Sequence, residues 1–334
     1  MSLGERNRYS INDRYVEDAG RVFLTGVQAL ARLPIQQLRA DRRRGLNTAA
    51  LLAGYPGSPL AGLNFEIENA KRLVPDLPIV HRPLLNEEHG ATAVMGSQLA
   101  AEQPDCEFDG IAGFWYGKAP GLDRAGDALR HAVFTGTSRL GGAVAIVGDD
   151  PAAKSSTLPS SSDATLFDLH MPILYPGDVE EILTLGMHAI SLSRITGAWT
   201  ALKIVDAVAD GSGTLDLGAT VIEPVVPDLE IEGVKYEHHP DAKLLPPNNL
   251  ALERDLRVVR SELVRRYTVA NKLNPVIVNP HDAWIGLIAS GFTYHELRHA
   301  LHSIGLRTLD DIANAGIRLL HLQLPVPFDP QNIR

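Results

Sequence analysis

The sequence is poor in cysteine: Cys106 is the single thiol among 334 residues. One thiol cannot form a disulfide within the chain. It also cannot hold an iron–sulfur cluster or a structural zinc ion of the thiolate type. These kinds of stabilising or redox group are therefore excluded for this chain by itself. A chain without disulfides fits a reducing compartment, so the cytoplasm is the expected location.

Long apolar runs and an excess of positive charge are also missing. No segment approaches the roughly 20 apolar residues that span a bilayer, and no apolar segment follows the charges of the first six residues. We therefore expect a soluble protein without a signal peptide or membrane contact. The 40 Asp and Glu residues outnumber the 31 Lys and Arg residues. This balance argues against nucleic acid as a partner, because phosphate binding favours an excess of positive side chains.

Several common motifs of catalysis and nucleotide binding are absent as well. The sequence has no G-x-x-x-x-G-K-[ST], no H-E-x-x-H and no G-x-S-x-G, and its glycines near residue 54 do not match G-x-G-x-x-G. These absences argue against a P-loop, a zincin metal site and a serine-hydrolase nucleophile. The adjacent His238 and His239 lack a further metal ligand at a fitting spacing, so we expect them in an exposed loop.

Short apolar segments alternate with longer helical ones along most of the chain. Apolar strands separated by helices are typical of a parallel sheet with right-handed crossovers. The sequence therefore predicts an α/β protein with a doubly wound, mostly parallel sheet. Strands are expected at residues 21–25, 48–53, 79–80, 110–115, 143–147 and 199–205.

A change of composition indicates more than one domain. Pro, Asp and Glu accumulate between residues 217 and 249, and a helical segment follows. Further on, strand-like segments at 284–290 and 317–324 flank another helical pattern, which is the expected opening of a second α/β domain. A helix is also expected to begin at residues 330–334. The predicted organisation is a first domain over 15–216, a connection with a linking helix over 217–272, and a truncated second domain over 273–334.

The first candidate site is the loop Tyr55-Pro56-Gly57-Ser58-Pro59, which follows the predicted strand at 48–53. Ligands of open parallel sheets bind at the carboxyl ends of strands. Two prolines make the turn rigid, and Gly57 lets the backbone approach a ligand closely. Ser58 precedes a helical segment, so its hydroxyl is expected either to cap that helix or to contact a ligand.

The second candidate site is the segment Asn86-Glu87-Glu88-His89-Gly90-Ala91, which follows another predicted strand. It opens an Ala-rich helix that we expect to be buried. Carboxylates at a helix start often only compensate the helix dipole. With small residues behind them, they would also suit a carboxyl group buried against a flat ring. The residues alone leave both interpretations open.

Together these loops resemble the pyrimidine-binding domain of the 2-oxoacid:ferredoxin oxidoreductases, in which Y-P-x-[ST]-P follows the second strand and E-x-G-A opens a helix soon after. The indolepyruvate:ferredoxin oxidoreductase type is most similar, because it carries segments like FWYGKAPGLDR at 114–124, GDDP at 148–151 and SST at 155–157. The resemblance runs from Tyr15 to the end of the chain. Five motifs in the same order are more specific than any one of them.

The resemblance implies thiamine diphosphate as cofactor and a second domain similar to the transketolase C-terminal domain. Glu88, by its place in E-x-G-A, is the implied catalytic carboxyl that hydrogen-bonds the ring nitrogen N1′, and Glu87 is the alternative. Such a hydrogen bond promotes the imino tautomer that deprotonates the thiazolium carbon, and it is strongest in a dry site. Tyr55, Pro56 and Gly57 are the other implied cofactor contacts.

The resemblance also implies substrate contacts. Ser58 stands where the family has a Thr or Ser that hydrogen-bonds the 2-oxoacid. By spacing, Thr137 stands where pyruvate-specific members have an arginine for the substrate carboxylate, and Arg139 or Lys118 is an alternative anion partner. Because indolepyruvate-type members also lack that arginine, an aryl or branched 2-oxoacid is expected rather than pyruvate.

Parts of the implied enzyme are missing from the sequence. It has no G-D-G…N segment for Mg²⁺ and the diphosphate, and no cysteines for clusters. Mg²⁺ and iron–sulfur clusters are therefore expected only elsewhere, in further domains or a partner subunit. The complete enzyme is expected to be a homo-oligomer that uses a 2-oxoacid, CoA and ferredoxin. The alternatives are another thiamine diphosphate enzyme, of the transketolase or 2-oxoacid dehydrogenase type, and a non-catalytic ligand-sensing or scaffold module.

Overall fold

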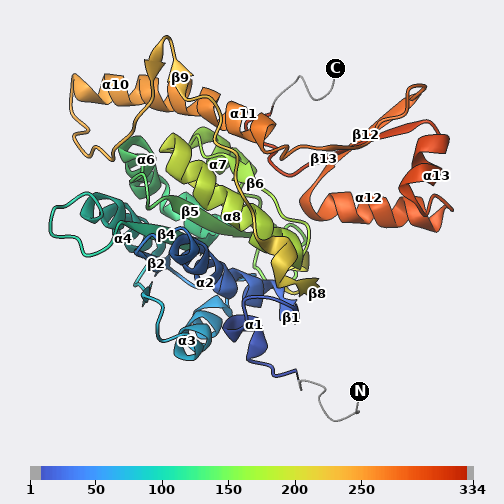
Figure 1. Cartoon of the computed structure of the whole chain (residues 1–334), viewed down its shortest axis with the longest axis horizontal. Coiled ribbons are helices and arrows are strands. Elements are labelled where there is room, and N and C mark those ends of the chain that lie inside the picture. Colours follow the sequence, from blue (N-terminus) through green and yellow to red (C-terminus); the bar gives the residue numbers. More distant parts are fainter. Residues whose placement is uncertain (1–8, 329–334) are drawn as a thin grey trace.

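The computed structural model describes residues 9–328 of the chain. A six-stranded sheet lies at the centre of its larger unit, with strand order β3-β2-β4-β5-β7-β6 (Figure 1). All neighbouring strands of this sheet are parallel. The predicted α/β fold with a mostly parallel sheet is confirmed. The strands are β2 (Thr48–Gly54), β3 (Ile79–Pro83), β4 (Gly110–Lys118), β5 (Ala143–Asp149), β6 (Ile173–Leu174) and β7 (Thr200–Val205).

Helices cover both faces of this sheet. Successive side chains of a strand point to opposite faces, and on β4 Phe114 and Tyr116 pack into one core while Trp115 packs into the other. All three side chains are fully buried. Both faces of the central strands are therefore apolar, as expected for a parallel sheet between two helical layers. One layer contains α2 (Gly26–Arg43), α3 (Leu63–Leu73) and α8 (Val179–Thr196), and the other contains α4 (Glu87–Ala100), α5 (Ala119–Arg124), α6 (Gly126–Thr135) and α7 (Asp163–Asp168).

The first predicted strand lies outside the central sheet. β1 (Arg21–Thr25) pairs antiparallel with β8 (Ser212–Asp216) in a separate two-stranded sheet. The short helices α1 (Asp13–Val16) and α9 (Asp206–Ala209) directly precede β1 and β8 in the sequence. Alternating burial along β1, with Val22 and Leu24 buried and Phe23 exposed, is the pattern of an edge ribbon that covers the core with one face.

The connection after residue 216 folds back over the first unit. A 3₁₀ turn (Leu217–Thr220) and a small hairpin of β9 (Glu230–Ile231) and β10 (Val234–Lys235) lead into one long helical stretch. The helical stretch consists of α10 (Asn248–Arg254), a π-helical segment (Asp255–Arg260) and α11 (Ser261–Ala270).

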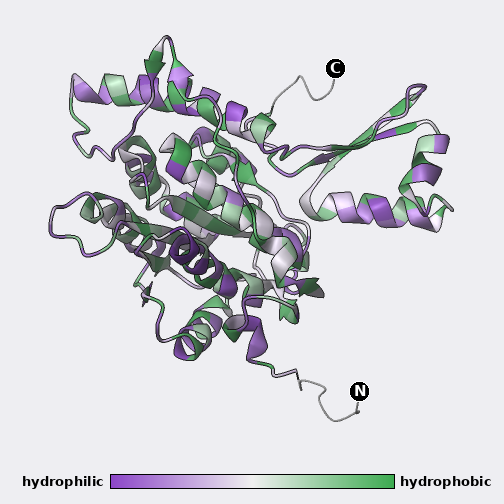
Figure 2. Cartoon of the chain, in the orientation of Figure 1, coloured by the Kyte–Doolittle hydropathy of each residue, from purple (hydrophilic) through white to green (hydrophobic). Residues whose placement is uncertain are grey.

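In Figure 2 hydrophobic residues follow the central strands, while many hydrophilic residues lie on outer helices such as α10 and α12.

The two adjacent histidines of this connection, which were expected in an exposed loop, differ in burial. His239 is exposed, as predicted, but His238 is only 7% exposed. Its ring nitrogens face the carbonyl oxygens of Thr137, at 2.9 Å, and Arg194, at 2.8 Å. Burial lowers the pKa of His238. The residue thus fastens the connection to the first unit, and the prediction of an exposed loop is wrong for it.

Residues 276–322 form a smaller α/β unit beside the first one (Figure 1). Its sheet has the order β11-β13-β12, with β12 and β13 parallel and β11 antiparallel to β13. Strand, helix and strand lie where the sequence predicted them, whereas the helix expected at 330–334 lies outside the described residues. No helix between residues 9 and 328 is both long and apolar enough to cross a membrane. The elements are β11 (Val276–Val278), β12 (Ile285–Ser290), α12 (Gly291–Ser303), α13 (Leu309–Asn314) and β13 (Ile317–Leu322).

Candidate functional site

The candidate residues on the loops after β2, β3 and β4 lie at one edge of the central sheet. In a parallel sheet all carboxyl ends of the strands meet at the same edge, and ligands of such folds bind there. The backbone N–H of Tyr55 donates to the carbonyl of Tyr116, and that of Leu84 donates to the carbonyl of Gly54. The loops are thereby joined to one another as they leave the sheet. This edge is the candidate site.

The loop after β2 passes against the side chain of Lys118. A Cβ atom added at Gly57 would lie 2.9 Å from Cδ of Lys118, so glycine permits this close approach. Pro56 and Gly57 are half-buried and Tyr55 is 43% exposed. The loop therefore presents a rigid, partly accessible surface next to the end of β4.

Ser58 does not cap the following helix. Helix α3 has Gly62 as its N-cap residue, and no side chain caps it. The Ser58 hydroxyl instead contacts the hydroxyl of Ser155, on the loop after β5. Of the two interpretations of Ser58, the capping one is wrong, and its hydroxyl lies at a junction between two loops of the candidate edge.

The two adjacent carboxylates of α4 have different surroundings. Asn86 caps the helix by accepting a hydrogen bond from the backbone of His89, at 2.9 Å. Glu87 is only 5% exposed, whereas the side chain of Glu88 is exposed. The indole N–H of Trp115 donates to the Glu87 carbonyl at 2.9 Å and fixes this first turn against β4. The structure therefore turns Glu87, and not Glu88, toward the interior.

Small residues make room for Glu87 at the end of β4. A Cβ added at Gly121 would lie 2.5 Å from Oε1 of Glu87. A Cβ added at Gly90 would lie 2.8 Å from Cα of Gly54, so the start of α4 packs directly on the end of β2. The other carboxylate oxygen, Oε2, lies 4.0 Å from Nε of Arg124. These glycines place the Glu87 carboxylate against the start of α5, and the helix that carries it against the end of β2.

Lys118 is a cation of this edge. It is the last residue of β4 and is half-buried. It makes no ion pair with any residue between 9 and 328, unlike Lys203, which pairs with Asp163 at 2.6 Å. An ammonium group without a carboxylate partner is suited to an anionic ligand group.

The structure adds Asp150 and Ser155 to the candidate edge. Asp150 follows β5 and accepts hydrogen bonds from the backbone N–H groups of Lys154, at 2.8 Å, and Ser155, at 2.9 Å. These bonds, that of Ser155 above all, lower the pKa of Asp150. They also fold the loop so that Ser155 reaches Ser58. The position of GDDP directly after an apolar strand was the signal in the sequence for this role.

The neighbouring Asp149 is the last residue of β5, and its side chain is buried. It is 1% exposed, and its Oδ2 accepts hydrogen bonds from the backbone N–H and the hydroxyl of Ser162, at 3.0 and 3.1 Å. Nζ of Lys203 lies 3.5 Å from the same oxygen. Burial raises the pKa of Asp149. Its Oδ1 is buried and has no hydrogen-bond partner in the described part of the chain.

Thr137 and Arg139 are not brought together with the other candidates. Both precede β5, whose seven residues separate the two edges of the sheet by about 20 Å. The Thr137 side chain is fully buried and donates a hydrogen bond to the carbonyl of Ser193, at 3.2 Å. Arg139 lines a groove of about 910 Å³ at this opposite edge, together with Arg44 and other residues. Their placement does not support the predicted contact with the substrate.

Comparison with known proteins confirms the resemblance predicted from the sequence. The chain is 24% identical over 287 residues to indolepyruvate oxidoreductase subunit IorA of Archaeoglobus fulgidus, covering 86% of this chain and 41% of the relative. It is also 24% identical over 312 residues to the subunit of the same name of Pyrococcus horikoshii, covering 92% and 42%. The chain thus spans about two fifths of the length of these curated relatives. No protein-family model matches the chain.

A solved structure confirms the fold. The chain is similar to a 2-oxoglutarate:ferredoxin oxidoreductase from Magnetococcus marinus, which was solved with 2-oxoglutarate, coenzyme A and succinyl-CoA bound. The TM-score is 0.65 at 14% sequence identity, and the match covers 95% of this chain and 55% of the other. At this identity the likeness concerns the fold alone.

Proposed function

We propose that this chain supplies the pyrimidine-binding part of a thiamine diphosphate-dependent indolepyruvate:ferredoxin oxidoreductase. The complete enzyme converts an aryl 2-oxoacid and CoA into acyl-CoA and carbon dioxide, and it passes two electrons to ferredoxin. The observation that carries this proposal is the meeting of the Tyr55–Ser58 loop, Glu87 and Lys118 at one sheet edge. The names of the curated relatives support the choice of reaction.

We assign residues 15–216 to the pyrimidine-binding domain, 217–272 to the connection, and 273–334 to the start of a domain similar to the transketolase C-terminal domain. The parallel sheet with its candidate edge supports the first assignment. The word "subunit" in the relatives' names supports a partner subunit for the complete enzyme. We place that enzyme in the cytoplasm. Neither the transketolase or dehydrogenase alternative nor the scaffold alternative is supported by the comparisons.

The residues of this edge fit one half of the cofactor. The buried Glu87 carboxylate offers a hydrogen-bond partner for the ring nitrogen N1′, and Gly121, which has no Cβ, leaves room for that carboxylate. Pro56 and Gly57, with the exposed ring of Tyr55, form the surface that would flank the pyrimidine. When bound, thiamine diphosphate supplies the nucleophilic carbon at which a 2-oxoacid loses carbon dioxide. Mg²⁺ and the diphosphate require the G-D-G…N segment that this chain lacks.

The role that we propose for Glu87 is to share a proton with N1′. A hydrogen bond to a charged or acidic group is strengthened where water is excluded, and Glu87 is nearly buried before any ligand binds. The Trp115 N–H holds the backbone of Glu87 in place. The motif E-x-G-A favours Glu88, whereas burial favours Glu87. We therefore propose Glu87 as the catalytic carboxyl and keep Glu88 as the alternative, which the same experiment tests.

Lys118 and Ser58 are the substrate contacts that we propose. The unpaired ammonium of Lys118 is suited to the 2-oxoacid carboxylate, and the Ser58 hydroxyl lies on the neighbouring loop. Thr137 and Arg139 are left out of the proposal because they lie at the opposite edge of the sheet.

The proposed function predicts a preference for aromatic substrates. The complete enzyme should show a kcat/KM at least about tenfold higher for indolepyruvate or phenylpyruvate than for pyruvate, because an aromatic ring buries about 150 Å² or more of surface. The measurement is ferredoxin reduction with each 2-oxoacid at saturating CoA. A higher kcat/KM for pyruvate would contradict the assignment to the indolepyruvate type and leave only the general 2-oxoacid reaction.

A further inference from the structure

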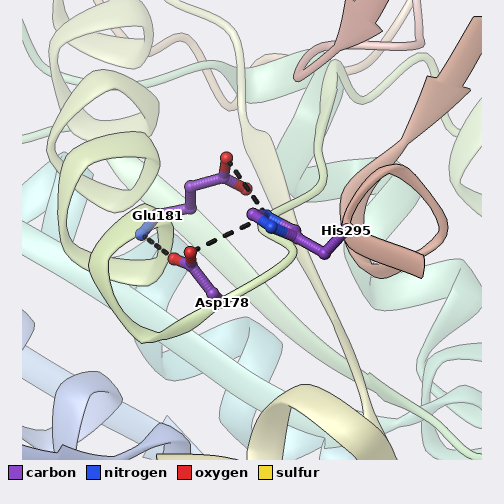
Figure 3. Close-up of side chains that lie close together, drawn as sticks. All are labelled: Asp178, Glu181 and His295. Atoms are coloured by element: carbon purple, nitrogen blue, oxygen red, sulfur yellow. Dashed lines mark hydrogen bonds and ion pairs between the residues drawn. The ribbon is translucent and has the colours of Figure 1, made fainter. Parts of the chain in front are cut away.

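A second group of titratable side chains lies where the two units of the chain meet (Figure 3). Asp178 is the N-cap residue of α8, Glu181 belongs to the first turn of α8, and His295 belongs to α12 of the smaller unit. One potential ligand atom from each of these three residues lies within 4.8 Å of the other two. Nε2 of His295 is 3.5 Å from Oε1 of Glu181 and 3.7 Å from Oδ2 of Asp178.

Backbone groups orient both carboxylates toward the histidine. Oδ1 of Asp178 accepts a hydrogen bond from the backbone N–H of Glu181 at 2.9 Å. Oε2 of Glu181 accepts one from the backbone N–H of Gly177 at 2.7 Å. Each carboxylate thus has one oxygen held by the backbone and the other turned toward His295. Outer hydrogen bonds of this kind orient the ligands of metal sites.

Gly177 lets the two units approach each other at this point. A Cβ atom at Gly177 would overlap Cδ2 of His295, and it would lie 2.5 Å from the carbonyl oxygen of Gly291, where α12 begins. The loop before α8 and the start of α12 are therefore in direct contact. The position of His295 relative to the carboxylates is fixed by this contact between main chains.

A second histidine, His321, lies next to this group. It lies on β13, is only 3% exposed, and its ring stacks on Tyr294 with centroids 3.7 Å apart. Its Nδ1 faces Oε1 of Glu181 at 3.8 Å, beyond hydrogen-bond distance. Its Nε2 is buried and has no hydrogen-bond partner among residues 9–328. The same holds for Nε2 of His295, which faces the two carboxylates at ion-pair distance only. Buried polar atoms without partners are rare and require an explanation.

We propose that Asp178, Glu181 and His295 form a binding site for a divalent transition-metal ion, with Zn²⁺ the best match, and that His321 completes it as the fourth ligand. Zinc takes imidazole nitrogens and carboxylate oxygens at about 2.0–2.2 Å in tetrahedral sites, which sets neighbouring ligand atoms about 3.3–3.6 Å apart. The separations of 3.5 and 3.7 Å among Asp178, Glu181 and His295 are close to that geometry. His321 is not part of the group whose ligand atoms all lie within 4.8 Å of one another, so its ring would have to move toward the ion. The two carboxylates balance the charge of the ion. Mg²⁺ and Ca²⁺ are disfavoured because they prefer ligand sets made of oxygen.

The bound ion would join the two units of the chain. Its ligands come from the first turn of α8 on one side, and from α12 and β13 on the other. An ion that binds the folded state and not the unfolded one raises the melting temperature. The proposed role is structural: the ion fixes the smaller unit against the layer of helices on the first.

The experiment is a calorimetric titration of the purified full chain, freed of metal with EDTA, with Zn²⁺ and separately with Mg²⁺. We expect one Zn²⁺ per chain, no comparable binding of Mg²⁺, and a higher melting temperature with zinc. Co²⁺ at the same site should give the intense visible absorption of tetrahedral coordination. His295→Gln and His321→Gln should each weaken zinc binding at least about tenfold, as expected for loss of a direct ligand where even outer partners contribute 10- to 100-fold.

Two further variants complete the experiment. Asp178→Asn keeps an N-cap acceptor for α8 while removing a charged ligand, so it should fold and bind zinc more weakly. His131→Gln is the matched control. His131 is an exposed histidine on another helix, α6, and its Nδ1 lies 3.6 Å from a carboxylate oxygen of Asp127. It should leave zinc binding unchanged.

Three outcomes would overturn the proposal. The first is a folded chain that binds no zinc at stoichiometric concentration, which would leave a simple ion pair between the two units. The second is a zinc affinity that His295→Gln leaves unchanged. An affinity that His321→Gln leaves unchanged would overturn the assignment of His321 as a ligand. The third is an equal loss of affinity in His131→Gln, which would indicate adventitious binding to surface histidines.

Discussion

Replacing Glu87 with glutamine in the complete enzyme is expected to lower kcat by roughly 10²-fold or more. This is the scale of losing one preorganised hydrogen bond in a catalytic site. A glutamine amide keeps the size of the side chain but has no acidic proton to share with the ring nitrogen N1′. Glu87 is 5% exposed and its carboxylate packs against Gly121 at the start of α5, so it is placed to act in a dry site. Turnover with indolepyruvate, CoA and ferredoxin is the measurement.

Glu88→Gln is the matched control for that experiment. Glu88 is the next residue of the same helix, but its side chain is exposed, so its replacement should change kcat much less. Melting temperatures of both variants show whether the fold is intact. A large loss for Glu88→Gln and a small one for Glu87→Gln would assign the role to Glu88, as the E-x-G-A motif predicts. If neither variant loses turnover, the thiamine diphosphate proposal is contradicted.

The purified 334-residue chain is expected to bind thiamine diphosphate weakly and to reduce no ferredoxin. The sequence contains no G-D-G…N segment for Mg²⁺ and the diphosphate, and Cys106 alone cannot hold a cluster that passes electrons onward. Calorimetric titration with thiamine diphosphate and Mg²⁺, followed by a ferredoxin reduction assay, measures both properties.

The same assay has a positive control. Addition of the remaining domains or of the partner subunit should restore both tight cofactor binding and turnover. Turnover by the chain alone would contradict the proposal that it holds only half of the site. Tight cofactor binding without turnover would place the diphosphate site within this chain and contradict the inference from the missing segment.

The central sheet was predictable because its strands are apolar on both faces. The runs at 143–147 and 199–205 became β5 and β7 with almost the same bounds. β1 was also predicted as a strand, but its partner was not, because the pattern of one strand does not specify which other strand it pairs with. The pairing of β1 with β8 joins segments that are nearly 200 residues apart.

The candidate site was predictable in its loops and less so in its individual side chains. Adjacent residues of a helix point about 100° apart, so the sequence could not decide whether Glu87 or Glu88 faces the interior. Packing of Gly90 on Gly54 decides it in the structure. Thr137 was chosen by its spacing from a motif. Spacing measures distance along the chain and does not tell at which edge of the sheet a residue lies.

The proposed site is tested most directly by where thiamine diphosphate binds relative to this chain. A structure of the complete enzyme with the cofactor bound measures this. We expect a Glu87 carboxylate oxygen within about 2.6–3.2 Å of the pyrimidine nitrogen N1′, with Tyr55, Pro56 and Gly57 against the ring. A cofactor held entirely by other domains, with the loops after β2 and β4 away from the ring, would contradict it.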